Sequence, residues 1–254
     1  MKLHYRVIGD GQPFVILHGL FGYSDNWQSH ALKLSQYYKV ILVDQRNHGH
    51  SPWAETNSYQ EMAADVFELC QDLNLENIIL LGHSMGGKTA MFFAQKHENL
   101  IDKLIIVDMG MKAYPPHHTE IIAGLKSLEL DHYKSRGQAD EALQKSISSY
   151  SIRQFLLKNL FWEEKGKLAW RMNLNVLERE MPEILEAFDS DTTILVPTLF
   201  IKGDLSNYIL EEDKPSLKKV FIDSEFETIE EAGHWVHAEK PELFLNTILS
   251  FCLL

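Results

Sequence analysis

The chain has 254 residues, of which 45% are hydrophobic and 24% are charged, and its formal net charge is −12. This length allows one large domain or one domain with an insertion, and the apolar content allows a sizeable core. The negative charge, without any run of lysine or arginine, argues against nucleic acid and anionic membrane surfaces as partners.

The two cysteines and the N-terminal segment point to an intracellular protein. Cys70 lies on an apolar helical stripe and Cys252 in an expected C-terminal helix, so both are interpreted as buried thiols, not as a disulfide. Residues 1–6 already resemble a strand, which argues against a signal peptide. No apolar run reaches the roughly 18 residues that a membrane span requires. We therefore expect a cytoplasmic protein without a membrane span.

The first half of the chain alternates strands with helices. Leu3–Ile8 and Phe14–Leu17 are separated by a turn signal and predict an antiparallel opening hairpin. Val40–Val43 and Ile78–Leu81 are short, continuous apolar runs, typical of buried strands in a parallel sheet. Tyr59–Leu73 between them has apolar residues at helical spacing. This alternation predicts a doubly wound, mostly parallel sheet.

The pattern changes after Gly110. Leu104–Val107 is one more buried strand, but we expect no strand between Met111 and about Asp191. Apolar residues in that segment recur at helical spacing, so we predict a helical cap over residues 111–191, inserted between core segments 1–110 and 192–254. The groups that predict its helices are Ile121/Leu125/Leu128, Ala139/Leu143/Ile147 and Ile152/Phe155/Leu156/Leu160. The sheet is expected to resume at Thr198–Ile201 and Phe226–Ile229, followed by a closing helix over Pro241–Phe251.

Residues 82–86, Gly-His-Ser-Met-Gly, lie between the strand Ile78–Leu81 and an apolar helix that begins near Thr89. G-x-S-x-G at such a junction is typical of a nucleophile elbow, in which a serine is exposed on a sharp turn. Extended to Lys88 and Thr89, the same letters also fit the G-x-x-x-x-G-K-[ST] phosphate loop of NTPases. The local context does not separate these two interpretations.

Three other segments decide between them. His18–Gly22 follows a strand and could supply an oxyanion-hole N–H group, and Asp44–Ser51 could shape a loop beside the site. His234 lies in a loop between the last strand and the last helix. It follows the serine and an aspartate in the chain, and Ser, Asp, His is the order of catalytic residues in hydrolases that have a nucleophile elbow. The NTPase hypothesis leaves all three unexplained and is rejected. His48 and His50 have no further cluster at ligand spacing, so we expect no metal.

The whole chain resembles α/β-hydrolases of the small carboxylesterase type, and more closely the YbfF-type bacterial esterases and their mitochondrial abhydrolase relatives. This resemblance implies an α/β fold with a mostly parallel sheet flanked by helices, an inserted helical cap, and hydrolysis of esters or thioesters without a cofactor. The motifs that carry it are HGLFG (18–22), DxRNHGxS (44–51), GHSMGGK (82–88), LIIVD (104–108), QFLLKNLF (154–161) and GHWVHAEKP (233–241).

Serine needs an adjacent base to act as a nucleophile. We expect Ser84 to attack an acyl carbonyl and His234 to be its base, with the backbone N–H groups of Leu20 and Met85 as the oxyanion hole. The acid of the triad has two candidates. A G-x-x-D pattern after Thr198–Ile201 would place it at Ser206, and Asp204 comes two positions early. The resemblance favours Asp108 instead, at the end of the preceding strand.

Apolar residues of both the core and the cap are expected to line the acyl pocket, and such a pocket suits esters or thioesters of small to medium acyl groups. We expect a monomer or weak homodimer that acts on a small molecule. A C–C bond hydrolase, a cofactor-free perhydrolase and a non-catalytic ligand receptor are alternatives on the same fold. We expect Lys88 to be structural or to contact the cap. The expected pocket residues are Leu20, Phe21, Met85, Met109, Met111, Phe155, Leu156, Leu160, Phe161, Trp162 and Trp235.

Overall fold

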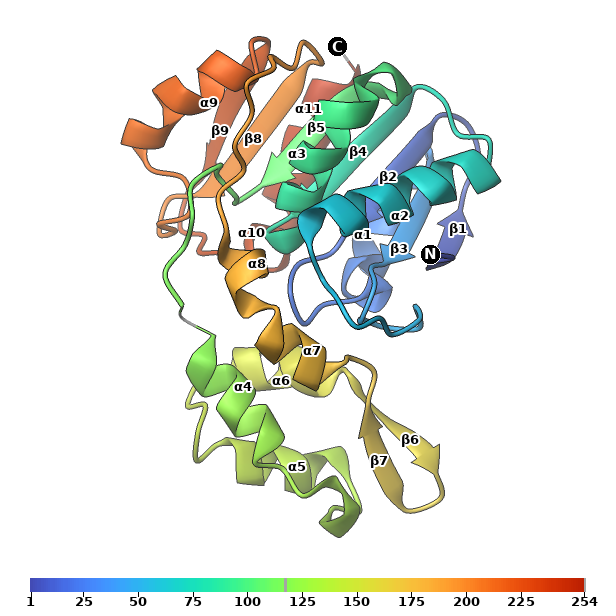
Figure 1. Ribbon diagram of the computed structural model, residues 1–254, viewed down its shortest axis with the longest axis vertical. Helices are drawn as coiled ribbons and strands as arrows, with labels where there is room; N and C mark the ends of the chain where they lie inside the picture. Colours follow the sequence, from blue (N-terminus) through green and yellow to red (C-terminus); the bar gives the residue numbers. More distant parts are fainter. Residues whose placement is uncertain (117, 254) are drawn as a thin grey trace.

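The computed structural model describes residues 1–116 and 118–253, and it is built around one seven-stranded sheet (Figure 1). The strand order is β1-β3-β2-β4-β5-β8-β9. Every neighbouring pair is parallel except β1 with β3. The strands of this sheet are β1 (His4–Ile8), β2 (Pro13–Leu17), β3 (Lys39–Asp44), β4 (Ile78–His83), β5 (Ile101–Val107), β8 (Thr198–Gly203) and β9 (Ser224–Ile229).

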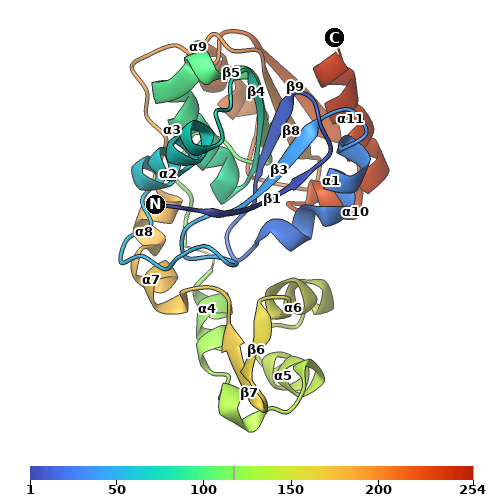
Figure 2. The same ribbon diagram turned by 90° about the vertical axis from the view of Figure 1, so that its right-hand side faces the viewer.

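Helices cover both faces of the sheet, with α2, α3 and α9 on one face and α1, α10 and α11 on the other (Figure 2). Successive strand residues point to opposite faces, so Leu80 belongs to the first core and Leu81 to the second. These helices are α1 (Gln28–Leu34), α2 (Tyr59–Asp72), α3 (Met85–His97), α9 (Lys214–Val220), α10 (Val236–Glu239) and α11 (Pro241–Leu253), with 3-10 turns at Ser24–Trp27, Glu98–Leu100, Leu130–His132 and Glu211–Asp213.

The expected antiparallel hairpin of the first two strands is wrong. Strand β1 pairs with β3, with His4 opposite Asp44, whereas β2 lies on the far side of β3 and runs parallel to it. Residues 14–17 are all buried, which suits an interior position between β3 and β4, whereas β1 is only partly buried and suits an edge. The turn between β1 and β2 therefore crosses the end of β3, which lies between these two strands in the sheet.

The segment between β5 and β8 forms a separate lobe at the end of the sheet where the parallel strands finish (Figure 1). Contrary to expectation, this lobe contains a β-hairpin as well as helices. Its strands carry Glu163, Glu164 and Lys167 at exposed positions, and this polar content hid the strand pattern. The elements of the lobe and its connections are α4 (Thr119–Lys126), α5 (Arg136–Leu143), α6 (Tyr150–Leu157), β6 (Leu160–Glu164), β7 (Lys167–Trp170), α7 (Leu174–Arg179) and α8 (Met181–Leu185).

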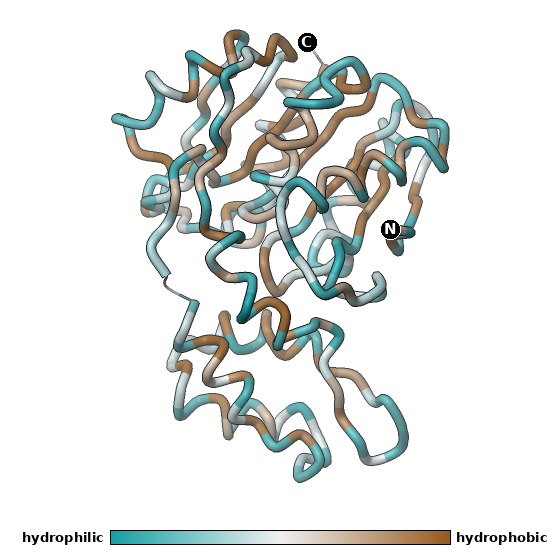
Figure 3. Tube along the Cα trace, viewed as in Figure 1, coloured by the Kyte–Doolittle hydropathy of each residue, from teal (hydrophilic) through white to brown (hydrophobic). Residues whose placement is uncertain are grey.

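Hydrophobic residues concentrate on the central strands, whereas hydrophobic and hydrophilic residues alternate along the surface helices (Figure 3). Strand β4 is buried along its whole length, as a central parallel strand requires. Within residues 1–116 and 118–253, no helix has both the length and the hydropathy that a membrane crossing demands.

Strand β4 and helix α3 nearly touch where β4 ends. A Cβ atom on Gly82 would lie 2.1 Å from the carbonyl oxygen of Gly86, and one on Gly86 would lie 2.4 Å from the carbonyl oxygen of Leu17. Both neighbours are backbone atoms, which move only with their strand or helix. Glycine at these two positions therefore lets α3 begin directly against β4 and β2.

We expect Gly86→Ala to lower the free energy of unfolding by about 1–3 kcal/mol, because the new methyl group overpacks α3 against β2. The measurement is the urea midpoint of the purified protein. Gly137→Ala is the matched control, since a Cβ atom there would come no closer than 3.7 Å to Ser135 Oγ. Alanine also suits a helix better than glycine, so Gly137→Ala should change stability by less than about 1 kcal/mol and in the opposite direction. Equal midpoints for both variants would contradict the close approach.

Candidate active site

Ser84 lies on the turn that joins β4 to α3. Its backbone has φ 53° and ψ −119°, a conformation that non-glycine residues rarely adopt. The close approach of β4 and α3 imposes this conformation and points the side chain away from the sheet. The residue is 8% exposed, at the N-terminal end of α3. A side chain held in a strained turn at the edge of a sheet is the arrangement expected of an elbow.

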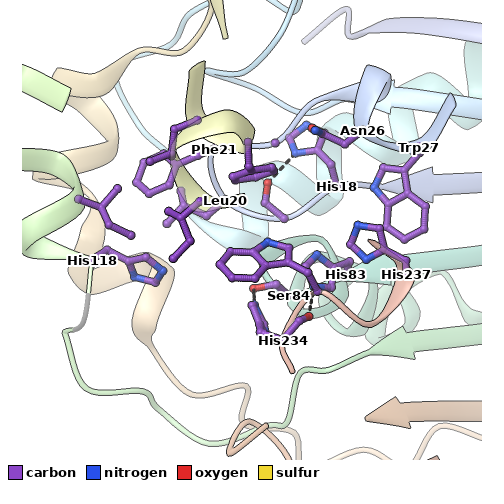
Figure 4. A pocket seen from close by; sticks show the side chains of 17 residues that line it. His18, Leu20, Phe21, Asn26, Trp27, His83, Ser84, His118, His234 and His237 are labelled. Atoms are coloured by element: carbon purple, nitrogen blue, oxygen red, sulfur yellow. Dashed lines mark hydrogen bonds between the residues drawn. The ribbon is translucent and has the colours of Figure 1, made fainter. Parts of the chain in front are cut away.

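The structure brings together three side chains that the sequence places far apart. His234, in the loop after β9, has its Nε2 atom 2.9 Å from Ser84 Oγ. Its Nδ1 atom lies 2.7 Å from Oδ2 of Asp108, directly after β5 (Figure 4 shows the Ser84–His234 bond). Since a carboxylate only accepts hydrogen bonds, Nδ1 carries the proton and Nε2 can accept from the serine hydroxyl. This geometry is that of a nucleophile, a base and an orienting acid.

Asp108 is fully buried and is held from the neighbouring strand β8. The N–H group of Gly203 donates to its Oδ1 over 3.3 Å, and the hydroxyl of Ser206 donates to its Oδ2. Burial raises the pKa of Asp108 from 3.8 to about 6, while the hydrogen bond from Ser206 acts in the opposite direction. Ser206 thus supports the carboxylate from the position where the G-x-x-D pattern would have put an acid.

Asp204, the second candidate acid, is not brought to the site. Its side chain is exposed and accepts a hydrogen bond from the N–H group of Ala232 over 3.1 Å. The sequence singled out the position of Ser206 only as a mismatch to a pattern. Its hydroxyl could have been recognised as a donor only once Asp108 was known to be its neighbour.

The loop after β2 faces Ser84 and presents two candidate N–H groups. The N–H of Phe21 donates to His48 Nε2 over 3.2 Å, so it is already used. Within the described part of the chain, no group accepts a hydrogen bond from the N–H of Leu20 or of Met85. Met85 is the first residue of α3, where N–H groups lack an intrahelical partner. These two N–H groups are therefore available to a substrate oxygen.

Three buried histidines hold the loops of the site as neutral hydrogen-bonding groups. His48 Nδ1 donates to the carbonyl of Arg46, and burial lowers the pKa of His48 to about 3, so its Nε2 stays unprotonated and accepts from Phe21. His18 Nε2 accepts the N–H of Gln45 over 3.0 Å. His83 Nε2 donates over 2.8 Å to the carbonyl of His234, and burial lowers its pKa to about 3.

Lys88 is fully buried and does not face the site. Its ammonium group donates to the backbone carbonyl of Lys112 over 3.0 Å and to the carbonyl of Glu186. A phosphate-loop lysine must reach the phosphates of a bound nucleotide. The orientation of Lys88 agrees with the rejection of the NTPase hypothesis, and both carbonyls lie within residues 111–191, which are expected to form a cap.

Two spaces adjoin Ser84. The larger, of about 60 Å³, is lined by Phe21, Phe155 and Trp235 among others (Figure 4). It shares Phe155 and Trp235 with an adjacent crevice of about 580 Å³ between α6 and the loop after β9. The smaller, of about 10 Å³, is lined by Met85 and Met109 among others. Trp162 was expected here but lies on β6 and is 47% exposed. Met111, Leu160 and Phe161 also line neither space.

Comparison with known proteins gives a consistent set of similarities. A family model described as "alpha/beta hydrolase fold" matches residues 12–241. The chain is 37% identical to sn-1-specific diacylglycerol lipase ABHD11 of Danio rerio, over 96% of this chain and 79% of the relative. It is 34% identical to Esterase YbfF of Escherichia coli, over 94% and 92% respectively. A solved structure titled "Marine microorganism esterase" matches with a TM-score of 0.96 and 41% identity, over 98% of this chain and 99% of that one.

The raised pKa of Asp108 predicts the pH dependence of Ser84 reactivity. Asp108 takes up a proton as the pH falls through about 6 and then loses the charge that stabilises protonated His234, so the reaction of Ser84 with a fluorophosphonate should slow on the acid side. Ser206→Ala removes a hydrogen bond that favours the carboxylate. The acid limb of the rate should therefore move up by about one pH unit.

The measurement is the rate of Ser84 labelling at pH values between 4 and 9, with intact-mass spectrometry as the readout. Ser216→Ala is the control, because this exposed hydroxyl lies on α9 and donates to the carbonyl of Asp213. An acid limb that stays in place in Ser206→Ala would show that the hydroxyl does not act on the carboxylate.

Proposed function

Because this chain belongs to the α/β-hydrolase fold family, we propose that it hydrolyses carboxylic esters or thioesters of small to medium acyl groups through Ser84, His234 and Asp108. The predicted fold class is confirmed by the family match and by the likeness to a solved esterase. The observation that carries the proposal is the continuous hydrogen-bonded chain from Asp108 through His234 to Ser84 Oγ.

The reaction follows from this geometry. Ser84 Oγ attacks the acyl carbon while its proton passes to His234 Nε2, and the carbonyl oxygen becomes an oxyanion that the N–H groups of Leu20 and Met85 accommodate. The oxyanion collapses, the bond to the leaving group breaks, and His234 returns the proton to that group. A water molecule then attacks the acyl-enzyme by the same route, releasing the carboxylic acid and restoring Ser84.

The names of the relatives support the ester class, since one is a lipase and two others are esterases. The substrate is a small molecule, and we propose that residues 111–191 form a cap over the site. The cytoplasmic location, the monomeric or weakly dimeric state and the lack of a cofactor stay predictions. C–C bond hydrolysis and perhydrolysis would use the same three side chains, so ester turnover is the property to measure first.

We expect the wild-type protein to hydrolyse p-nitrophenyl esters and to react with a fluorophosphonate at Ser84, because the serine is hydrogen-bonded to its base. Ser84→Ala should abolish both turnover and labelling. The measurements are p-nitrophenol release and peptide mapping of the labelled protein. Wild-type protein that binds acyl esters but neither cleaves them nor becomes labelled would contradict the proposal and favour a non-catalytic receptor.

Asp108→Asn and Asp204→Asn, assayed side by side, test which acid orients His234. Asp108→Asn should lower kcat by as much as about 10⁴-fold, because an amide favours the wrong tautomer of the histidine. Asp204→Asn should leave kcat within about twofold, since that exposed side chain bonds only a backbone N–H group outside the site. The reverse pattern would assign the acid to Asp204.

A further inference from the structure

The two spaces beside Ser84 differ in size. We call the first the open lobe: it contains Phe155 and Trp235, which also line the crevice of about 580 Å³. We call the second the closed lobe: it measures about 10 Å³, which is room for about one water molecule. The closed lobe is lined by Leu20, Tyr59, Ser84, Met85, Met109, Tyr114, His118, Ile184, Leu185 and Tyr208.

The position of the base decides which half of an ester each lobe receives. The leaving group must lie beside His234, because His234 returns the proton to it. His234 lines the open lobe, whereas on the closed side its ring is covered by the stacked ring of Tyr208, with centroids 3.9 Å apart. The proposed oxyanion donors add to this contrast, since Met85 lines the closed lobe and not the open one, whereas Leu20 lines both.

We propose that the acyl chain of the ester enters the closed lobe and that the leaving group occupies the open lobe. The protein then prefers esters of short acids. Lys88 is the positioning residue that limits the length of the acyl chain that the closed lobe admits. This inference rests on the proposed ester hydrolysis. The crevice beyond the open lobe leaves room for a large alcohol or thiol.

Part of the wall of the closed lobe comes from the two segments that connect the core to residues 119–185, since Tyr114, Ile184 and Leu185 line it. These segments are bonded to each other, since the N–H of Tyr114 donates to the carbonyl of Leu185 over 2.9 Å. They are also bonded to the core, because the hydroxyl of Tyr59 donates to the carbonyl of Ile184 over 2.7 Å. Tyr114 in turn donates its hydroxyl to the carbonyl of Tyr208 over 2.8 Å. Separating these connections would therefore enlarge the closed lobe.

Lys88 joins both connections to the elbow helix. Its ammonium group donates to the carbonyls of Lys112 and Glu186, one on each connection, and lies 4.8 Å from the centroid of the Tyr114 ring. Over the described residues, no carboxylate forms an ion pair with it. Burial lowers the pKa of Lys88 to about 8. The charge of Glu186 only partly opposes this effect of burial. A buried ammonium group that forms no direct ion pair costs stability, and holding these two segments together accounts for its presence.

The test compares kcat/KM for p-nitrophenyl acetate, butyrate and octanoate. Wild-type protein should favour acetate over octanoate by about tenfold or more, because each added methylene overfills a closed pocket. Met109→Ala, which enlarges the closed lobe by shortening a buried wall residue, should move the preference towards butyrate or octanoate. The acetate-to-octanoate ratio is the readout, since a general loss of folded protein lowers both rates equally.

Lys88→Met keeps most of the side-chain volume and removes the ammonium group. The acetate-to-octanoate ratio should fall by about tenfold, with a lower KM for octanoate, because the walls separate. Lys103→Met is the matched control, since Lys103 also donates to two backbone carbonyls, of Phe251 over 2.7 Å and Cys252 over 3.2 Å, far from the closed lobe. Its ratio should equal that of wild type.

The outcomes separate the two proposals. If wild-type protein cleaves none of the esters and Ser84 stays unlabelled, the proposed function fails. If it cleaves octanoate as well as acetate, or if Met109→Ala leaves the preference unchanged, the acyl chain does not use the closed lobe. A ratio in Lys88→Met equal to that of Lys103→Met overturns the role of Lys88. If Lys88→Met does not fold, Met109→Ala still decides the lobe assignment.

Discussion

The close approach of helix α3 to strands β4 and β2 is the constraint on which the site depends. Without a side chain at Gly82 and Gly86, the helix begins while the chain is still against the sheet, and the residue between them takes φ 53°. That residue is Ser84, so its hydroxyl emerges at the ends of β2 and β5 as well as β4. The acid and the oxyanion loop directly follow the neighbouring strands β5 and β2, so they reach Ser84 over short segments, and the loop after β9 brings the base.

The loops around Ser84 are fixed by buried neutral histidines and a buried lysine. His48 both donates and accepts hydrogen bonds and His83 donates one, and burial keeps both rings uncharged by lowering the pKa of each to about 3. Lys88 lies on the helix that carries the nucleophile and donates to both connections between the core and the segment 119–185. Orientation of the site thus comes from directed hydrogen bonds to the backbone, which a purely apolar core would not supply.

Much of this could be predicted from sequence, because it is encoded in short segments. The apolar runs of β4 and β5 and the elbow motif each have a local cause. The pairing of β1 with β3 could not be predicted this way, since it depends on which strand fills the interior of the sheet. The β6–β7 hairpin was missed because its exposed positions are charged, and Trp162 was misplaced because a side chain on that hairpin points away from the site. The role of Ser206 depends on a contact between residues 98 positions apart.

The location of Asp108 at the end of β5 also affects the mechanics of the molecule. Only Met109 and Gly110 separate this carboxylate from the segment that leaves the core towards α4, and the N–H of Gly110 donates to the Tyr114 hydroxyl within that segment. The carboxylate itself accepts hydrogen bonds from Gly203 and Ser206 of the core. The charge that orients His234 is therefore held by the core alone, although the chain leaves the core only two residues later.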